Sequence, residues 1–345
     1  MGKVTDFILE QIVRIGKKVK NNPKIRSILY KNRNENIFAS VDQHERMLAD
    51  NIRVNTYHDA IQKNVKPGDT VVDLGSGTGV LSFFALKKSP KMVYAVDHGN
   101  IIELARFLAK KNNFTDISFV KSHSRDFDPE EKIDVIIHEQ IGDFLLDEDM
   151  VRNLCDLRDR LLKPGGKILP SRFELFFEPI SLKKGHRTPY IWEQQLHGVD
   201  FHGAKRWLLG SENKIGKAKS HCRLMPGDQG LFHCEPEPIL SFDLMKTDPA
   251  NFPKKMHFTK RVNMAGTMDG FCLYFNIQFD EELCISTNPF LEPTHWHSQI
   301  FRTEPTGVEE GDVIEAELVI NDHTKVSSWT FDHRIFKTVF SSGDN

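Results

Sequence analysis

The chain lacks the sequence features of secreted, membrane-spanning or disulfide-linked proteins. Only five of its 345 residues are cysteine, and none are spaced Cys-x-x-Cys. This scarcity argues against a disulfide framework or a zinc site and favours a reducing compartment. No apolar run approaches the ~20 residues of a membrane helix, and the N-terminus does not resemble a signal peptide. We therefore expect a cytoplasmic protein, or a nuclear one if the source is eukaryotic, with no metal and no membrane partner.

The chain also lacks a strong overall charge, since its formal net charge is -2. The charge is uneven, because residues 1–33 carry nine Lys and Arg against two acids. Apolar residues recur at three- and four-residue steps over residues 4–20, which predicts an amphipathic helix there. A solvated helix face is the usual meaning of such a basic run, so binding to nucleic acid is not predicted from it.

The hydrophobic pattern predicts an α/β protein with two unlike halves. A helix is expected over residues 42–64. Strands then alternate with helices as far as residue 169, which predicts a Rossmann-like, mostly parallel sheet. The predicted strands are 70–74, 92–97, 117–122, 133–138 and 167–169, with helices near 79–88, 99–112 and 149–162 and a turn at 163–166. Beyond Pro170, short alternating segments separated by turn residues predict an antiparallel β-barrel-like or sandwich domain.

These patterns divide the chain into three regions. Residues 1–66 are expected to form N-terminal helices. Residues 67–170 are expected to form the parallel-sheet domain. Residues 171–345 are expected to form the β domain, interrupted near 188–210 by a more helical segment.

The most informative segment is residues 71–79, Val-Val-Asp-Leu-Gly-Ser-Gly-Thr-Gly. An apolar run ends in Asp73 and leads into three glycines at alternate positions: Gly75, Gly77 and Gly79. This arrangement predicts a buried strand that turns sharply into a helix and leaves its backbone open to a ligand. The next apolar run ends in Asp97, and an acid at the tip of a neighbouring parallel strand suits two ribose hydroxyls.

Two common nucleotide motifs do not fit this segment. A dinucleotide fingerprint needs its last glycine where the chain has Val80, and Asp73 would lie unfavourably beside a pyrophosphate. A P-loop requires Gly-Lys-Ser/Thr, which is absent here. Instead, the acid before Gly-x-Gly-x-Gly and the second acid at Asp97 resemble the class I methyltransferases that bind S-adenosylmethionine.

Two glutamates follow the strand predicted at 133–138. Glu139 comes directly after it, and Glu148 lies nine residues later, with Gly142 between them. This spacing predicts a loop folded back on itself at the edge of the sheet where ligands bind. Two carboxylates there can hold a cation or exchange a proton.

Several further segments resemble the protein arginine methyltransferases, and the resemblance covers residues 38–335. The segment from His138 to Glu148 resembles their double-glutamate loop. Pro-Thr-His-Trp at residues 293–296 is similar to their Thr-His-Trp loop, and residues 44–53 are similar to their cofactor-capping helix. Tyr-Phe-Asn-Ile at 274–277 and Lys-Pro-Gly-Gly at 163–166 match as well.

The resemblance assigns expected roles to individual residues on the cofactor side. Arg53 would hold the carboxylate of S-adenosylmethionine, and Met47 would lie against the sulfonium. The three glycines would line the cofactor loop above Asp73. Asp97 would take the ribose hydroxyls, and Ser124 falls where the family has its adenine-binding acid.

On the substrate side, the resemblance places Glu139 and Glu148 around a guanidinium and pairs His295 with Asp50. A guanidinium is planar and keeps its proton at neutral pH, so two carboxylates can fix its plane and concentrate its charge on one edge. The proton released on methylation would pass to Glu148 or to the His295–Asp50 pair, and the sequence does not choose between them.

The chain departs from the family at two aromatic motifs. The family's Tyr-Phe-x-x-Tyr is replaced by a stretch without tyrosine at residues 36–41. Its Trp-Met-Gly-Tyr is replaced by Gln-Ile-Gly-Asp at residues 140–143, where Asp143 adds a negative charge. Both changes remove aromatic surface and hydroxyl groups near the expected substrate.

Three functions follow from these observations. The first is S-adenosylmethionine-dependent methylation of a guanidino group, most simply arginine in a protein or peptide. The second is methylation of a small cationic or amino metabolite on the same scaffold, and the third is a silent binding scaffold.

The segment from Trp192 to Asp200 also resembles the family's dimerisation arm, which implies a head-to-tail homodimer. Base methylation of nucleic acid is disfavoured, because its usual Asn/Asp-Pro-Pro-aromatic motif is absent after residue 137.

Overall fold

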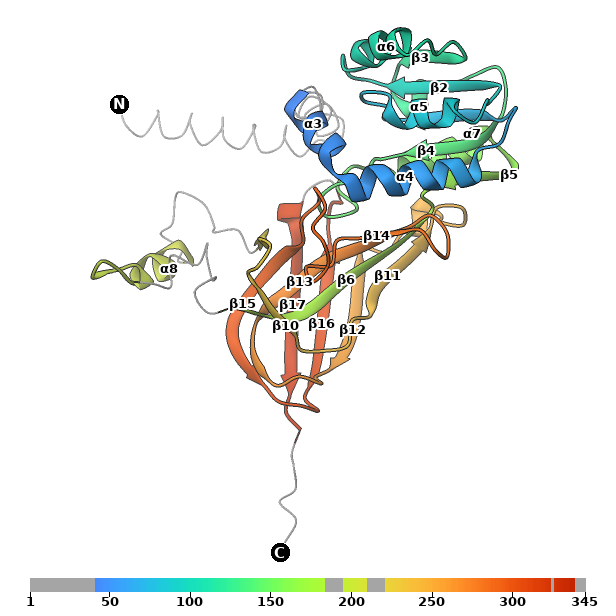
Figure 1. The fold of residues 1–345 in the computed structure, drawn as a ribbon. Coiled ribbons are helices and arrows are strands. Elements are labelled where there is room, and N and C mark those ends of the chain that lie inside the picture. The colour runs from blue at the N-terminus through green and yellow to red at the C-terminus, as the bar shows by residue number, and fades with distance from the viewer. Residues whose placement is uncertain (1–40, 184–194, 210–220, 324–325, 339–345) are drawn as a thin grey trace, which may run out of the picture.

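The computed structural model describes residues 41–183, 195–209, 221–323 and 326–338. The helix predicted at residues 4–20 and the aromatic replacement at 36–41, except Val41, lie outside these residues. A parallel-sheet domain and an antiparallel β domain lie one above the other, with a helix at their junction (Figure 1). The predicted α/β class, with a Rossmann-like sheet followed by an antiparallel domain, is confirmed.

Residues 41–64 form two helices where the sequence predicts one over 42–64. The first, α3, spans Val41–Ala49, and the second, α4, spans Asn51–Asn64. The break falls at Asp50, whose φ of -75° and ψ of 93° are extended, and whose carboxylate accepts a hydrogen bond from the backbone N–H of Arg53. An aspartate that caps a new helix in this way ends the preceding one.

The parallel sheet has the strand order β3-β2-β1-β4-β5. Its strands are β1 Thr70–Leu74, β2 Met92–Asp97, β3 Ile117–Lys121, β4 Ile133–His138 and β5 Leu162–Leu169. The helices of this domain are α5 Val80–Leu86, α6 Ile102–Lys111 and α7 Met150–Leu161, with a short 3-10 turn, η1, at Ser124–Asp126. The strand order reverses between β1 and β4, and ligands bind at such points beyond the carboxyl ends of the strands.

The turn predicted at residues 163–166 lies inside β5, which is longer than the strand expected at 167–169. The pairing of β5 with β4 shifts register there, and Gly165 has a left-handed φ of 78°. A Cβ at Gly166 would lie 2.9 Å from the carbonyl oxygen of Asp134. The two glycines therefore form a bulge within the strand rather than a turn before it.

Apart from the predicted arm, the described strands of the β domain form two antiparallel sheets. The larger has the order β10-β6-β13-β15-β9, with β11 beside β6 and β14 beside β13, and the smaller has the order β12-β16-β17. Their bounds are β6 Arg172–Leu182, β9 His221–Arg223, β10 Gln229–Phe232, β11 Pro238–Asp243, β12 Lys255–Arg261, β13 Gly266–Gln278, β14 Cys284–Ser286, β15 Gln299–Val308, β16 Val313–Ile320 and β17 Trp329–Phe336, with 3-10 turns η3 Pro249–Asn251 and η4 Val326–Ser328.

Aromatic rings fill the space between these two sheets. Phe331 of β17 lies with its ring centroid 5.6 Å from that of Phe177 on β6. It also lies 5.7 Å from Phe271 on β13 and 5.8 Å from Phe301 on β15. Edge-to-face pairs at these separations are favourable beyond the area they bury. The abundance of phenylalanine in the sequence is thus explained in part by this core.

A buried ion pair also connects the two sheets. The Nζ atom of Lys260 on β12 lies 2.7 Å from the Oε1 atom of Glu178 on β6, with both side chains almost fully buried. Lys260 also donates to the carbonyl oxygen of Glu237, whereas Glu178 Oε2 is buried with no hydrogen-bond partner. Burial raises the pKa of Glu178 to about 7, although the Lys260 charge opposes the shift.

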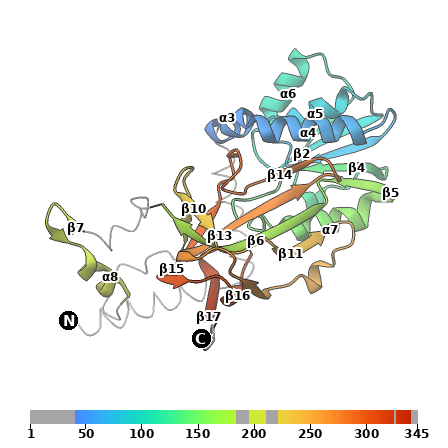
Figure 2. The ribbon, with the colours of Figure 1, turned by 60° about the horizontal axis from the view of Figure 1, so that its bottom comes forward.

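The segment predicted to interrupt the β domain projects away from it (Figures 1 and 2). A two-stranded hairpin, β7 Gln195–Leu196 and β8 Val199–Asp200, precedes helix α8, His202–Leu209. Val199 and Trp207 are 59% and 45% exposed. The start of the predicted arm, including Trp192, lies outside the described residues.

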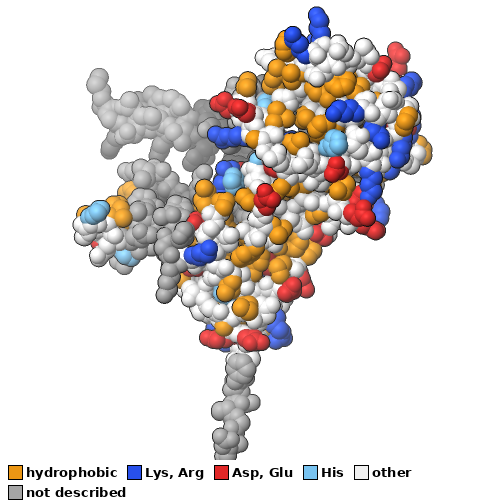
Figure 3. Space-filling model, viewed as in Figure 1, with side chains coloured by type: hydrophobic (Ala, Val, Ile, Leu, Met, Phe, Trp, Pro, Cys, Tyr) orange, Lys and Arg blue, Asp and Glu red, His pale blue; other side chains and the backbone are white. Residues whose placement is uncertain are grey.

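The surface carries both signs of charge. Basic and acidic side chains both occur around the edge of the parallel-sheet domain on the face shown in Figure 3. In the part of the chain that the structure describes, no helix is long and apolar enough to cross a membrane. Within the same residues, no cluster of three or more His, Cys, Asp or Glu side chains could hold a metal ion.

Candidate active site

The glycine turn lies at the carboxyl end of β1, next to the end of β2. Gly75, Gly77 and Gly79 have φ values of 73°, 52° and 84°, which is the left-handed region that favours glycine. A Cβ at Gly77 would lie 2.9 Å from the Cε1 atom of His44. The buried imidazole of His44 on α3 therefore packs directly over the bare backbone of the turn.

Asp97, at the end of β2, holds this turn in place. Its two carboxylate oxygens accept hydrogen bonds from the backbone N–H groups of Gly77, at 2.9 Å, and Gly99, at 2.7 Å. Each carboxylate oxygen has a second lone pair, so the side chain can still accept hydrogen bonds from hydroxyl groups. The position at the tip of β2 is the one that the sequence predicts for the ribose acid.

Asp73 lies beneath the turn and is completely buried. Its Oδ2 atom accepts hydrogen bonds from the backbone N–H and the hydroxyl of Ser82, at 2.9 and 2.6 Å. Burial raises its pKa to about 6, whereas these hydrogen bonds oppose the rise. Because Ser82 lies in the first turn of α5, Asp73 ties the end of β1 to the start of that helix.

Arg53 of α4 reaches from the capping helices to the carboxyl end of β4. Its Nη2 atom lies 2.7 Å from the Oε2 atom of Glu139, and its Nη1 atom donates to the carbonyl oxygen of Met47. The Nε atom is buried and has no hydrogen-bond partner. The structure therefore pairs the expected cofactor-binding arginine with one of the expected substrate-binding glutamates.

Five acids lie on the loop between β4 and α7, where the sequence predicts a folded-back loop, and the last of them, Asp149, pairs with Arg125 and Arg152. Glu139 is paired with Arg53, and Asp143 with Arg223 of β9, whose Nη2 atom lies 2.9 Å away. Asp147 accepts a hydrogen bond from the backbone N–H of Phe144. Glu148, in contrast, forms no ion pair with any described residue. Burial, followed by repulsion from Glu139, Asp147 and Asp143, raises its pKa well above the usual range.

Asp50 and His295 form the pair that the sequence predicts. The Oδ2 atom of Asp50 lies 2.8 Å from the Nδ1 atom of His295 and accepts a hydrogen bond from the backbone N–H of the same residue. The aspartate thereby fixes both the ring and the backbone of His295. An imidazole held in this way keeps its Nε2 atom free to exchange a proton.

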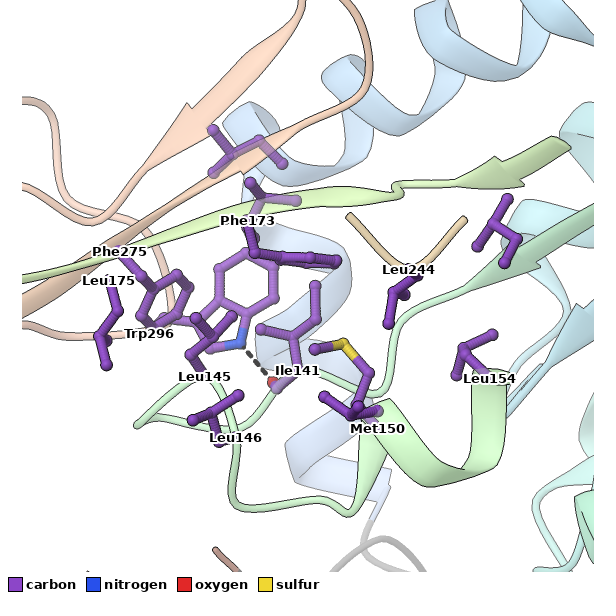
Figure 4. Close-up of a cluster of buried hydrophobic side chains, with 14 of the residues drawn as sticks. Ile141, Leu145, Leu146, Met150, Leu154, Phe173, Leu175, Leu244, Phe275 and Trp296 are labelled. Carbon is purple, nitrogen blue, oxygen red and sulfur yellow. Dashed lines mark hydrogen bonds between the residues drawn. The ribbon is translucent and has the colours of Figure 1, made fainter. Parts of the chain in front are cut away.

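The loop that carries the glutamates is anchored in the β domain. The indole Nε1 atom of Trp296 donates to the carbonyl oxygen of Ile141 at 2.7 Å, and the indole lies in a buried apolar cluster shared by both domains (Figure 4). The Phe144 ring packs edge-to-face against Trp329 and Phe301. These contacts set where the two glutamates lie relative to His295.

Ser124 lies in η1, just after β3, and is buried. Its Oγ atom is 3.3 Å from the Nδ1 atom of His123, and its carbonyl oxygen accepts a hydrogen bond from Arg160. The neighbouring backbone N–H of Ser122 donates to the carbonyl oxygen of Asp97. Ser124 is thus near the strand that carries the ribose acid, and its adenine contact stays a prediction.

Three contributors to this site are not revealed by the sequence. His44 falls within the capping motif, but its spacing alone does not place it over Gly77. Arg223 lies 80 residues from Asp143, and no local pattern connects them. Tyr57 is a further example, because its buried hydroxyl donates to the carbonyl oxygen of His138 and ties α4 to β4.

The residues at the glycine turn fit S-adenosylmethionine. Buried side-chain atoms without hydrogen-bond partners include Arg53 Nε, Ser76 Oγ and Asp73 Oδ1. Buried polar atoms are nearly always paired, so three such atoms around one glycine turn indicate a site shaped for a polar ligand. An arginine suits the cofactor's carboxylate, and Asp97 suits its ribose hydroxyls.

This fold and site define a class I methyltransferase domain followed by a second, antiparallel domain. Residues 65–199 match the family model of a methyltransferase domain, and residues 174–334 match that of the arginine methyltransferase oligomerization subdomain. Protein arginine N-methyltransferase 6 of Danio rerio is 31% identical over 81% of this chain and 82% of its own length. The chain therefore belongs to the protein arginine N-methyltransferase family.

Other relatives and structures agree with this assignment. Protein arginine N-methyltransferase 2 of Xenopus tropicalis is 30% identical over 82% of this chain and 66% of its own length. The crystal structure of Arabidopsis thaliana protein arginine methyltransferase 10 has a TM-score of 0.74 and 25% identity, covering 90% of this chain and 97% of that chain. The Trypanosoma brucei PRMT1 enzyme-prozyme heterotetrameric complex with AdoHcy has the same fold, with a TM-score of 0.72 and 23% identity over 87% of this chain and 98% of that chain.

Proposed function

We propose that the protein transfers a methyl group from S-adenosylmethionine to the guanidinium of an arginine in a protein. The observation that carries this proposal is the state of Glu148. Its carboxyl group is partly buried and surrounded by other acids, and no described cation neutralises it. Such a group favours a cationic partner, and a guanidinium supplies one with two donors in the right plane.

The chain's own residues orient the reaction. Glu148 would hold one edge of the guanidinium, and Glu139 would hold the other once Arg53 turns towards a second carboxylate. The bound cofactor supplies an electrophilic methyl group on a sulfonium. Because transfer is an in-line displacement, most of the rate should come from positioning and electrostatic stabilisation. His295, fixed by Asp50, or Glu148 would accept the proton that the guanidinium loses.

The direct test is methyl transfer from radiolabelled S-adenosylmethionine to arginine-containing proteins, with guanidino and amino metabolites offered in parallel. Label is expected in the proteins. Label in the metabolites alone would overturn the proposed substrate class. Cofactor binding without any transfer would instead indicate a silent scaffold.

Replacing Asp97 by alanine should weaken binding of S-adenosylmethionine by about tenfold or more, because a carboxylate–hydroxyl hydrogen bond is charge-assisted. Titration calorimetry with the full chain would measure the dissociation constant. Asp116→Ala, at the opposite end of the same sheet, is the matched control and should leave it unchanged. Equal affinities for both variants would show that Asp97 does not hold the ribose.

We propose further that the protein is a head-to-tail homodimer built through the arm at residues 188–210. Val199 and Trp207 support this, because they are large apolar side chains exposed on β8 and α8, which project from the β domain. The match of residues 174–334 to an oligomerization subdomain also supports it. Such an arm would contact the cofactor domain of the other copy.

Deleting residues 190–207 should produce a monomer with reduced methyl transfer, since each site would lose the packing supplied by its neighbour. Sedimentation velocity would measure the molecular mass. Phe336→Ser removes a similarly exposed apolar side chain from the β domain and should leave the mass unchanged. A deletion variant that stays dimeric, or a fully active monomer, would contradict the proposed role of the arm.

A further inference from the structure

A small pocket of about 70 Å³ lies in the β domain beside the loop that carries His295. Its walls come from residues 224–229 on one side and 287–298 on the other. Thr294 and Trp296, the two neighbours of His295, both line it. The pocket therefore adjoins the loop that places His295 in the candidate active site.

The walls of the pocket are fixed by their own hydrogen bonds. The Gln229 side chain donates to the carbonyl oxygen of Pro289 and accepts from the backbone N–H of Gly227. Ser298 Oγ donates to the carbonyl oxygen of Thr287, and the backbone N–H of Leu224 donates to the carbonyl oxygen of Ser298. The two sides are thus linked before any ligand enters, which lowers the entropy lost on binding.

Further hydrogen bonds within the chain occupy most of the polar side chains of the walls. Thr287 Oγ1 bonds to the backbone of Phe275, and Thr294 Oγ1 donates to the carbonyl oxygen of Trp296. Asn288 Oδ1 accepts from the backbone N–H of Phe290. The lining side chains that carry charge or can gain it are Glu292, which is exposed, and His297, whose pKa burial lowers. The chemistry left for a ligand is therefore mainly apolar.

Large apolar side chains stand exposed at the mouth of this pocket. Met225 is 53% exposed and Leu291 58%, and the adjacent Phe290 is 44% exposed. Prolines 226, 289 and 293 add stiff apolar surface to the lining. Exposed apolar residues gathered at one concave site usually mark a place where another molecule binds.

We infer that this pocket binds a bulky apolar side chain that flanks the methylated arginine in the substrate polypeptide. This inference rests on the proposed function. A polypeptide advances ~3.3–3.6 Å per residue, so a chain leaving the site beside His295 reaches the neighbouring wall within a few residues. A polypeptide substrate can occupy the active site and the pocket together, because its arginine and its flanking side chain belong to one chain.

The sequence of the glutamate loop agrees with selection of the substrate by this pocket. Residues 140–143 offer no aromatic surface, and Asp143 is neutralised by Arg223. An acid that is already neutralised adds little to the affinity for arginine-rich substrates. An apolar pocket on the β domain instead increases the affinity for substrates with an apolar residue beside the arginine. Selectivity would then come from apolar contact beside the arginine rather than from added positive charge.

The test uses short synthetic peptides with one central arginine in a Gly/Ser background, with a single leucine placed at each flanking position in turn. At one or two positions, leucine should lower KM about tenfold relative to serine, as burial of one such side chain predicts. The turnover number should change little, because this contact is equally strong in the ground state and the transition state.

Met225→Ser combined with Leu291→Ser should abolish the preference for leucine while leaving methylation of the all-serine peptide and cofactor affinity unchanged. Met225→Leu should retain the preference. Met264→Ser, which removes a methionine of similar exposure (51%) elsewhere in the β domain, is the matched control.

The outcomes separate the two proposals. Peptides that are methylated with no preference for leucine, or with a preference that survives the double substitution, would overturn the pocket assignment alone. Cofactor binding with no methylation of any peptide or protein would overturn the proposed function, and the pocket assignment with it.

Discussion

Glu148→Gln should lower the turnover number by about 10²- to 10³-fold, the usual effect of removing one electrostatic contact to the reacting group. Glutamine keeps the shape of the side chain but removes a loop carboxylate that has no cationic partner among the described residues. Cofactor affinity should stay within a factor of about two, because Glu148 does not contact Arg53 or the glycine turn. Single-turnover methyl transfer and calorimetry would measure the two quantities separately.

Glu139→Gln is the informative comparison. Glu139 is ion-paired with Arg53, so its replacement should change cofactor affinity as well as turnover. The sequence predicts that both glutamates hold the substrate, and the pair with Arg53 adds an effect on the cofactor that the sequence does not predict. A Glu148→Gln enzyme with normal turnover would exclude Glu148 from guanidinium binding.

The pH dependence gives an independent check on Glu148. Its pKa is raised in the folded protein, so the carboxylate form is lost as the pH falls through a value above the usual glutamate range. The acidic limb of kcat/KM, which reports groups of the free enzyme, should therefore lie above that range. The limb should move or disappear in Glu148→Gln.

Lys260→Met should have the largest effect on stability, lowering the free energy of unfolding by about 3–5 kcal/mol at alkaline pH. Removing one partner of a buried ion pair leaves the other charge unpaired and desolvated, and this explains the size of the loss. In Lys260→Met the carboxylate left unpaired is that of Glu178, whose Oε2 atom already lacks a hydrogen-bond partner. Urea denaturation followed by circular dichroism would measure the change.

The cost of Lys260→Met should shrink as the pH falls, because Glu178 can then bind a proton. In the unaltered protein its pKa of about 7 exceeds the ordinary value of 4.5. The folded state therefore holds more protons than the unfolded state between these values, and this group's contribution to stability declines as the pH rises through them. Glu178→Gln should remove that decline.

Lys63→Met is the matched control for the stability prediction. Lys63 also forms ion pairs, with Asp280 and Glu282, but its side chain is half exposed. Exposed pairs contribute little, so this variant should unfold like the unaltered protein. A Lys260→Met variant that also matches the unaltered protein at alkaline pH would show that the buried pair contributes nothing.

The parallel sheet could be predicted closely because its strands are short apolar runs with distinct ends. Strands β1, β2 and β4 have the predicted bounds, and β3 is one residue shorter. The break at Asp50 was harder to predict, because an aspartate can lie inside a helix. It ends the helix only where its carboxylate accepts a hydrogen bond from the backbone N–H of a following helix. The bulge in β5 was missed because Pro-Gly-Gly most often marks a turn.

Without the family resemblance, the site could be predicted only where local sequence determines it. The glycine turn and Asp97 follow from strand ends that lie side by side in a parallel sheet. The pairing of Asp50 with His295 joins residues 245 apart and came from family resemblance, because no pattern in the chain connects them. The links from Arg53 to Glu139 and from Arg223 to Asp143 depend on side-chain packing, which composition and periodicity do not encode.

The anchoring of the glutamate loop has a consequence for how this chain can be divided. Ile141 and Phe144 belong by sequence to the cofactor domain, yet their partners Trp296, Phe301 and Trp329 come from the β domain. Cutting the chain near residue 170 would expose apolar surface on both pieces and release the loop. The two domains should therefore melt together, and exchanging one of them with a relative would require its loop and the facing aromatic residues to be exchanged as a set.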